Sequence, residues 1–348
     1  MTLGCATHAY SITDRDGNMV VSSGNLTNVE YNRVLNDVST ANVTIAVDSP
    51  GCCERMDQVR SWRHLLNIYR DGQFMWAGFI VGITWRADVV ELVAVDIIGL
   101  LDRRVPHRNF TFNDTDLTVI AQELVDDGLA PDDPGHTVTV IGPAGVLSDR
   151  TYDQNVGQTA DHLRDLADTG IDFTAVGNNV IILPDNFCDV VARLSDDDLP
   201  EELSVSEDGA RLITRQVVAG SEESDAVGTA GGVNSYYGLL EQYEEQTTLT
   251  TQVAADAAAR AKLASSAIVP VFIDTRAVTL SPDAGVEMSR LIPGWCVDIT
   301  STGTCRFISQ RLKITGVTVS EDGGTVGNPG QEQITLQVAA TGDQLVVG

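Results

Sequence analysis

The stretch NIYRDGQFMWAGFI, from Asn67 to Ile80, has the pattern of a β-hairpin. Two largely apolar runs flank an Asp-Gly pair, a strong short-range signal for a tight turn between antiparallel strands. The stretch contains no nucleophile motif, metal-ligand set or phosphate-binding loop. We therefore expect it to be a structural unit of the chain rather than a catalytic one.

The same order of elements returns near the C-terminus. The first copy is NIYRDGQFMWAGFIVGITW followed by VVELVAV, and the second is CVDITSTGTCRFISQRLKITGVTV followed by EQITLQVAA. Each contains a short strand, a turn with a glycine (Gly72 or Gly303), a long strand, a second turn and an alternating strand. Residue identity is close to nil, so two interpretations stay open: any two β-meanders look alike, or the chain holds two similar barrels.

An α+β segment separates the two copies. DTDLTVIAQELVDDGL places apolar residues on one helical face, with a cap among Asp114, Thr115 and Asp116 and a left-handed C-cap at Gly128. A second helix follows and ends at Gly170, and then a hairpin turns at Gly177-Asn178. VVELVAVDIIGLLDRR, before this segment, is predicted as a strand.

The predicted fold class is therefore mainly β with an α+β insert, in which two similar β-barrel domains flank a small α+β domain. The predicted domains are residues 1–110 (a first barrel completed by 203–235), residues 111–202 (the insert) and residues 236–348 (a helix plus the second barrel).

Charge and hydropathy exclude several classes of protein. The formal net charge of −27 argues against a basic groove for nucleic acid, because phosphate contacts need clustered Lys and Arg. The acidity fits general solubility, adaptation to salt, or a surface that repels DNA. The sequence shows no signal peptide and no apolar run long enough to span a membrane, so we expect a soluble protein made in the cytoplasm.

No motif points to catalysis, a cofactor or a metal. The five histidines lie apart from each other and from the cysteines, and no H-E-x-x-H, G-x-S-x-G or Walker sequence occurs. The acidic stretches SDDDLPEEL and APDDPG are predicted to be solvated turns; the alternative is a carboxylate-pair hydrolase acting on cell-wall polymers. Cys296 and Cys305 flank one predicted turn and could pair, although a reducing compartment disfavours a disulfide.

An ordered series of segments resembles a known family. RVLNDVSTANVTI, WRHLLNIYRDGQFMWAGFI, VELVAVDIIGLLDRR, LRDLADTGIDF, YYGLLE and LIPGWCVDI together look like the tail hub proteins, or minor tail proteins, of long-tailed actinobacterial phages (siphoviruses). These are similar in turn to the baseplate hub of contractile-tailed phages and to the base of type VI secretion spikes. The resemblance spans about Asn32 to Ala340.

The resemblance implies a homotrimer in which two barrels per chain form a pseudo-sixfold ring. That ring would join a hexameric tail tube to a threefold tail tip in the virion, and DNA would pass through it without specific binding. The implied partners are other copies of the chain, a distal tail protein or tail tube above, tail-tip or receptor-binding proteins below, and the tape measure protein.

Structural and interface residues are proposed within the resembling stretches. They are Arg70, Gly72, Trp76, Gly78, Asp96, Arg103, Arg104, Pro293, Gly294 and Asp298. For Arg103 and Arg104 two interpretations stay open: contact with carboxylates of a neighbouring subunit, or pairing with Asp96 or Asp102 at a barrel corner. Polar alternates of the final strands are expected to line the channel: Glu91, Glu332, Thr335 and Gln337.

Overall fold

The computed structural model of the chain describes residues 7–23, 26–47, 50–199, 205–207, 209, 212–220, 225–246, 251–266, 271–273, 277–281, 284–303, 305, 307–322 and 331–340. The chain divides into two compact units. One comprises Met1–Leu203 with Thr275–Val347, and the other comprises Ser204–Asp274. No helix of the described residues has the length and apolar character needed to cross a membrane.

The N-terminal part of the first unit is an antiparallel arrangement of strands. Its elements are β1 (His8–Asp14), β2 (Met19–Ser23), β3 (Leu26–Val34), β4 (Thr40–Ala46), α1 (Pro50–Met56), β5 (His64–Arg70), β6 (Gln73–Trp85), β7 (Val89–Val95) and α2 (Ile97–Leu101). The hairpin predicted at the Asp-Gly pair is confirmed, since β5 and β6 pair around Asp71 and Gly72. Both turn residues have positive φ (50° and 77°), as a two-residue hairpin turn requires.

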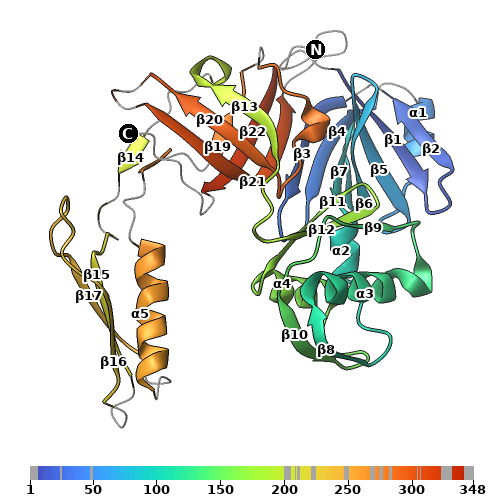
Figure 1. Cartoon of the computed structure of the whole chain (residues 1–348). Helices are drawn as coiled ribbons and strands as arrows, with labels where there is room; N and C mark the ends of the chain where they lie inside the picture. The colour runs from blue at the N-terminus through green and yellow to red at the C-terminus, as the bar shows by residue number, and fades with distance from the viewer. Residues whose placement is uncertain are drawn as a thin grey trace. The chain divides into compact units, whose positions relative to one another are not determined.

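The α+β segment follows as predicted. It contains β8 (Phe110–Asp116), α3 (Leu117–Leu129), η1 (Ala130–Asp132), β9 (Thr137–Val140), β10 (Leu147–Tyr152), α4 (Thr159–Ala167), β11 (Ile171–Val176), β12 (Asn179–Pro184), β13 (Val190–Ser195) and η2 (Asp196–Asp198). Figure 1 shows α2, α3 and α4 gathered at one end of the strands of the N-terminal part. One apolar cluster joins them to those strands, and it includes Phe79 of β6, Ile97 of α2 and Leu124 of α3.

Helix boundaries in this segment follow local chemistry. The Asp116 carboxylate accepts a hydrogen bond from the Thr118 N–H and caps α3, which confirms one of the three predicted caps. The predicted left-handed C-cap at Gly128 is wrong, because α3 continues through this residue to Leu129. A Cβ at Gly128 would lie 3.1 Å from the side chain of Thr159, so glycine permits close packing of α4 instead.

The C-terminal part of the first unit returns to strands. It contains β19 (Ala277–Thr279), η4 (Met288–Arg290), β20 (Cys296–Ser301), β21 (Ile308–Asp322) and β22 (Gln331–Ala340). Twelve strands form one sheet, whose main path runs β13-β20-β21-β3-β4-β7-β6-β5-β1-β2, while β22 pairs with β21 and β19. The pairing of β21 with β3 makes one sheet of the two ends of the chain.

The second unit is a small α+β body. It contains β14 (Val205–Glu207), β15 (Arg215–Ala219), β16 (Val227–Gly231), β17 (Glu241–Glu245), α5 (Gln252–Ser266) and β18 (Val271–Ile273). The sheet order is β16-β15-β17, and β14 pairs with β18. A Cβ at Gly228 of β16 would lie 2.1 Å from the backbone of Ala255, so this glycine allows α5 to pack directly on the strand.

Three predictions about the strands are corrected. No sheet of the described residues closes into a barrel, because the long strand β21 pairs across to β3 and joins the two parts instead. The strands within 203–235 do not complete the N-terminal part; β15 and β16 pair with each other, and β15 pairs with β17. The predicted strand VVELVAVDIIGLLDRR ends at Val95, since Asp96 caps the helix α2.

The repeated order of strands is present as a repeated backbone geometry. In β6 the register against β7 shifts between Ile80 and Gly82, and in β21 the register against β22 shifts between Ile314 and Gly316. The two bulges carry matching sequences, IVGIT and ITGVT. The isoleucine carbonyl at each bulge accepts a hydrogen bond from a left-handed residue two positions before the short strand: Trp62 to Ile80 at 2.7 Å, and Gly294 to Ile314 at 2.8 Å.

Candidate functional site

A buried cluster of charged side chains lies where the two repeats meet. Beneath the pairing of β3 with β21, the Arg70 guanidinium donates to both carboxylate oxygens of Glu332, at 2.7 and 2.8 Å. Arg70 is the last residue of the short strand of the first repeat, just before the turn, and Glu332 belongs to the last strand of the second. The two side chains are 6% and 0% exposed, so a bidentate ion pair fixes the repeats together inside the protein.

His8, Glu321 and Arg33 extend this cluster, and no motif or spacing in the sequence marks any of the three. His8 Nδ1 lies 2.6 Å from Glu321 Oε2, which links β1 to the end of β21. The buried Arg33 of β3 donates to the backbone carbonyl of Met75 in the first repeat and to that of Leu291, which lies shortly before the second. Glu321 lies 313 positions from His8 and Leu291 lies 258 positions from Arg33, so only the folded chain brings these groups together.

The hairpin residues of the first repeat are tightly packed. Trp76 is buried, and a Cβ added to Gly78 would lie 2.5 Å from its ring and 2.2 Å from the Val95 carbonyl oxygen. Gly78 therefore leaves the space that the Trp76 ring occupies. Gly72 serves the turn, as its positive φ requires.

Asp96 is the fully buried N-cap of α2. Its carboxylate accepts from the backbone N–H groups of Ile98, Gly99 and Ser39, at 3.0 to 3.2 Å. Burial raises the pKa of Asp96 to about 7, against the lowering effect of these hydrogen bonds. The residue ties β4 and β7 to the helix that faces the insert.

The two arginines after α2 have partners within the chain other than the predicted Asp96 and Asp102. The Arg103 guanidinium lies 5.3 Å from the centre of the Trp62 ring. Arg104 forms an ion pair with Asp132 at 3.1 Å. Asp102 pairs with Arg164 instead. Arg103 is exposed, so it is the one of the two with a face open to another molecule.

The site residues of the second repeat lie around the start of β20. Pro293 and Gly294 are buried, and Gly294 has φ 96° with its N–H bonded to Ile314. Asp298 lies directly opposite Arg311 on β21 and accepts a hydrogen bond from its Nε at 2.9 Å. These residues therefore support the bulge and its flanking strands.

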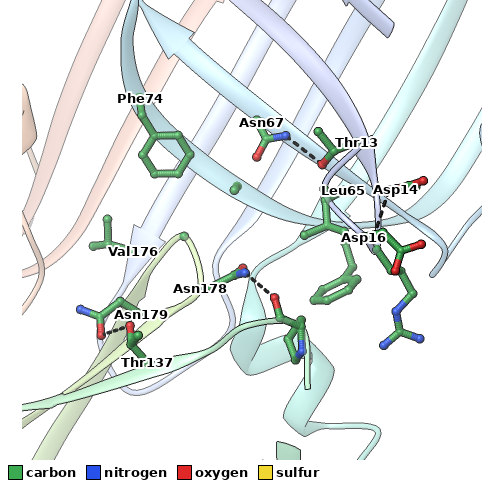
Figure 2. A pocket seen from close by; sticks show the side chains of 16 residues that line it. Thr13, Asp14, Asp16, Leu65, Asn67, Phe74, Thr137, Val176, Asn178 and Asn179 are labelled. Carbon is green, nitrogen blue, oxygen red and sulfur yellow. Dashed lines mark hydrogen bonds between the residues drawn. The ribbon is translucent and has the colours of Figure 1, made fainter. Parts of the chain in front are cut away.

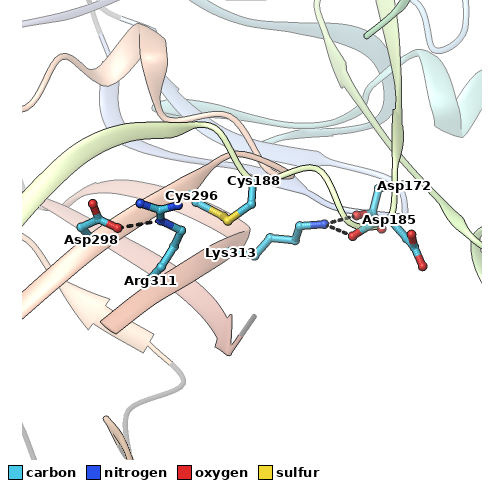
Figure 3. Close-up of a disulfide and its surroundings, with 7 residues drawn as sticks. All are labelled: Asp172, Asp185, Cys188, Cys296, Asp298, Arg311 and Lys313. Carbon is cyan, nitrogen blue, oxygen red and sulfur yellow. Dashed lines mark hydrogen bonds and ion pairs between the residues drawn. A yellow bond between two sulfur atoms is a disulfide. The ribbon is translucent and has the colours of Figure 1, made fainter. Parts of the chain in front are cut away.

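A disulfide and an ion pair attach the second repeat to the insert (Figure 3). Cys296 is bonded to Cys188, whereas Cys305 is free and exposed, so the disfavoured pairing of Cys296 with Cys305 is absent and Cys296 has a partner that the sequence analysis did not consider. Sequence spacing pointed to the near cysteine, while the pairing of β13 with β20 places the distant one beside Cys296. Lys313 lies 2.6 Å from Asp172 of β11.

The four channel candidates fall on two different faces. Glu332 is buried on the face of β22 that also carries Ile334 and Leu336, so its side chain is not available to line a channel. Thr335 and Gln337 lie an odd number of positions away and point to the opposite face, since strand side chains alternate. Glu91 of β7 is half-exposed and pairs with Arg86.

A pocket of about 540 Å³ lies between the β1–β2 turn, the hairpin strands and the loop at Gly177 (Figure 2). Its carboxylates do not form an acid–base pair of the kind a glycosidase uses. Hydrogen bonds from Asn18 lower the pKa of Asp14, whereas a general acid needs a raised one. Asp96, which has a raised pKa, does not line this pocket.

Metal chemistry finds no support in the described part of the chain, where no three His, Cys, Asp or Glu side chains gather as a metal site would need. No protein-family model and no curated protein matches the sequence of the chain.

Comparison of the fold gives clear matches. The chain is similar to a tail protein from Neisseria meningitidis MC58, with a TM-score of 0.56, 14% identity, and coverage of 95% of this chain and 96% of the other. The chain therefore has the same overall fold as that tail protein. A 43 kDa tail protein of prophage MuSo2 from Shewanella oneidensis matches with a TM-score of 0.58, 12% identity and coverage of 96% and 98%.

A prophage tail protein, gp18 from Listeria monocytogenes EGD-e, matches with a TM-score of 0.53, 14% identity and coverage of 94% of each chain. The fold shared with these tail proteins thus extends over nearly the whole of every chain compared. At identities this low, the likeness establishes the architecture and leaves the function to be argued from the chain itself.

Proposed function

We propose that this chain is a structural tail-hub protein of a bacteriophage virion, where it forms a trimeric ring of pseudo-sixfold symmetry. The observation that carries the proposal is the internal repeat of backbone geometry within a fold shared end to end with phage tail proteins. A chain with two similar halves lets three copies present six similar surfaces to a hexameric tail tube, while keeping threefold symmetry for the tail tip.

The placement of charge supports a passive rather than a catalytic role. Buried ion pairs such as Arg70–Glu332 join parts of one chain and offer no reactive group to a substrate. The pocket carboxylate Asp14 is held by its own turn. The competing proposal, a cell-wall hydrolase at the tail tip, finds no carboxylate pair of suitable environment in the pocket that the described residues form.

The proposed ring lets DNA pass without holding it. Three copies would carry a formal charge of −81, three times the −27 of one chain. Glu91 and Thr335 occupy matching positions of the two repeats, since each lies opposite the threonine two residues after the bulge glycine. We assign Glu91, Thr335 and Gln337 to the channel wall, where uncharged or acidic side chains leave duplex DNA hydrated.

The proposed partners are a tail tube or distal tail protein above the ring, tail-tip or receptor-binding proteins below it, and the tape measure protein. Mass measurement on assembled tails tests the proposal, and we expect three copies per tail. Six copies would assign the chain to a distal tail ring instead. Release of sugars or peptides from host cell wall, abolished by one carboxylate substitution, would replace the structural role by the enzymatic one.

A further inference from the structure

We propose that the Gly82–Trp85 half of β6 is a strand-pairing edge that receives a strand from a second copy of this chain. The inference rests on the ring proposed above and names the surface that would build it. Backbone pairing at a sheet edge is a common mode of association, since it satisfies unpaired N–H and C=O groups.

The second repeat shows what belongs on this edge. Its long strand, β21, pairs with β20 over its first half and with β3 over its second half, from Gly316 opposite Val34 to Asp322 opposite Asn28. β3 comes from the N-terminal part of the chain. Within one copy, therefore, the open half of the second repeat is already completed by a strand from the N-terminal part of the chain.

The first repeat has no such strand among the described residues. Its long strand, β6, pairs with β5 from Gln73 to Phe79, and the Trp62 N–H bonds to the Ile80 carbonyl, as Gly294 does to Ile314. Beyond the bulge, Gly82–Trp85 pairs with β7 on one side. On the other side, where β21 carries β3, no described strand is paired with it.

Side-chain burial marks the same difference. Counting from the bulge glycines, Ile83 matches Val317 and Trp85 matches Val319. Val317 and Val319 are 4% and 1% exposed, whereas Ile83 is half-buried and Trp85 is 51% exposed. The first repeat thus exposes an apolar surface at Ile83 and Trp85, whereas β3 covers the matching surface of the second repeat.

The occupant follows from the direction of the internal contact. β3 of the N-terminal part completes β21 of the C-terminal part, so an equivalent contact at β6 needs a strand from the C-terminal part of a different copy. Such a contact is head-to-tail, and a head-to-tail contact closes into a ring when its rotation divides a full turn. If the contacts within and between copies are equivalent, each chain contributes two similar steps of that ring.

Trp85→Lys tests the edge, because a charge pointing into a strand-pairing surface opposes association. The purified chain is studied by sedimentation over a concentration series. We expect the parent to associate, and we expect Trp85→Lys to remain folded while its association weakens at least about tenfold, given the apolar area a covered tryptophan buries. Met19→Lys, at a position 66% exposed on β2, is the matched control and should associate like the parent.

Hydrogen exchange supplies a readout specific to strand pairing. The amides of Gly82–Trp85 should exchange more slowly when the chain is associated than when it is dilute. A parent that stays monomeric at every concentration, a Trp85→Lys variant that associates as the parent does, or exchange that does not respond to association would each overturn the inference. Association through this edge in a protein absent from assembled tails would instead refute the tail function and leave the edge intact.

Discussion

The two repeats of this chain share a backbone but differ in how each is completed. Both have a short strand, a long bulged strand and a third strand in the same register. The side chains at matching positions differ in size and polarity: Trp76 and Gly78 of the first repeat correspond to Gln310 and Leu312 of the second. The backbone geometry is retained because the bulge and its hydrogen bonds define it, while the packing around it has diverged.

The repeats also differ in how they hold the α+β insert. The first is joined to it by a continuous apolar cluster, and the second by Cys188–Cys296 and by Lys313 with Asp172. Apolar contact is non-directional and tolerates changes of shape, whereas a covalent bond and an ion pair each fix one distance. The comparison indicates which parts of the chain should be most sensitive to substitution.

The largest effect is expected where the repeats meet. Glu332→Ala should lower the free energy of unfolding by about 3–5 kcal/mol, because it leaves the buried Arg70 guanidinium without its carboxylate. Replacing both residues by apolar ones, as in Arg70→Met with Glu332→Leu, should recover most of the loss. Urea denaturation measures both variants. A loss below about 1 kcal/mol for Glu332→Ala would mean that this pair does not fix the seam.

A smaller effect is expected from the glycine that distinguishes the first repeat. Gly78→Ala should cost about 1–3 kcal/mol or more, since its Cβ would meet the Val95 carbonyl oxygen at 2.2 Å. The bulge residue Gly82 is the control: a Cβ there would lie 3.4 Å from the Cβ of Val93, and Gly82→Ala should change stability by less than about 1 kcal/mol. Equal losses in the two variants would refute the packing argument.

The stability of the first repeat should depend on pH. Its last strand, β7, leads directly into the buried carboxyl of Asp96. The folded pKa of about 7 exceeds the ordinary value of 3.8, so the folded state holds this proton more tightly. The contribution of Asp96 to the free energy of unfolding should therefore fall as pH rises from about 4 to 7, on the order of 1 kcal/mol per pH unit.

Asp96→Asn removes this titration and should flatten the stability profile over that interval. Urea denaturation of the parent and the variant at several pH values measures the difference, and the parent minus the variant isolates the single group. Parallel profiles would show that the carboxyl titrates alike in the folded and unfolded chains.

The smallest effect is expected at the exposed end of β7. Glu91→Ala should change the free energy of unfolding by no more than about 0.5 kcal/mol, because its ion pair with Arg86 is largely solvated. Thr335, the matching position of the second repeat, should tolerate substitution by alanine equally well. Thermal unfolding of both variants measures the change in stability. A clear loss of stability in either variant would contradict the expectation that these half-exposed side chains contribute little.

Local features of the fold could be predicted from the sequence, and long-range ones could not. Three predicted features depend only on the conformational preferences of neighbouring residues, which can be read from the sequence. They are the Asp71–Gly72 turn, the Asp116 cap and the Gly177-Asn178 hairpin. The joining of β21 to β3 depends on residues almost the whole chain apart, and no local period encodes it. The predicted barrels failed for that reason.

The candidate site shows the same limit. Gly72, Gly78 and Asp96 were named from sequence and have structural roles that a turn, a close approach and a helix cap explain. Glu332 was assigned to the channel with Thr335, although the alternation of a regular strand separates them. The burial of a charged residue beside a distant partner such as Arg70 leaves no trace in the pattern of its own strand.

The pairing of β3 with β21 also sets the order in which this protein can be built. Val34 finds its partner Gly316 only after the ribosome has added most of the chain, which at about 5–20 residues per second takes on the order of 15–60 s. Until then one edge of β3 has no strand to pair with. Nascent chains therefore expose a strand edge that can pair with another chain, and the last stage of synthesis removes this hazard by supplying β21.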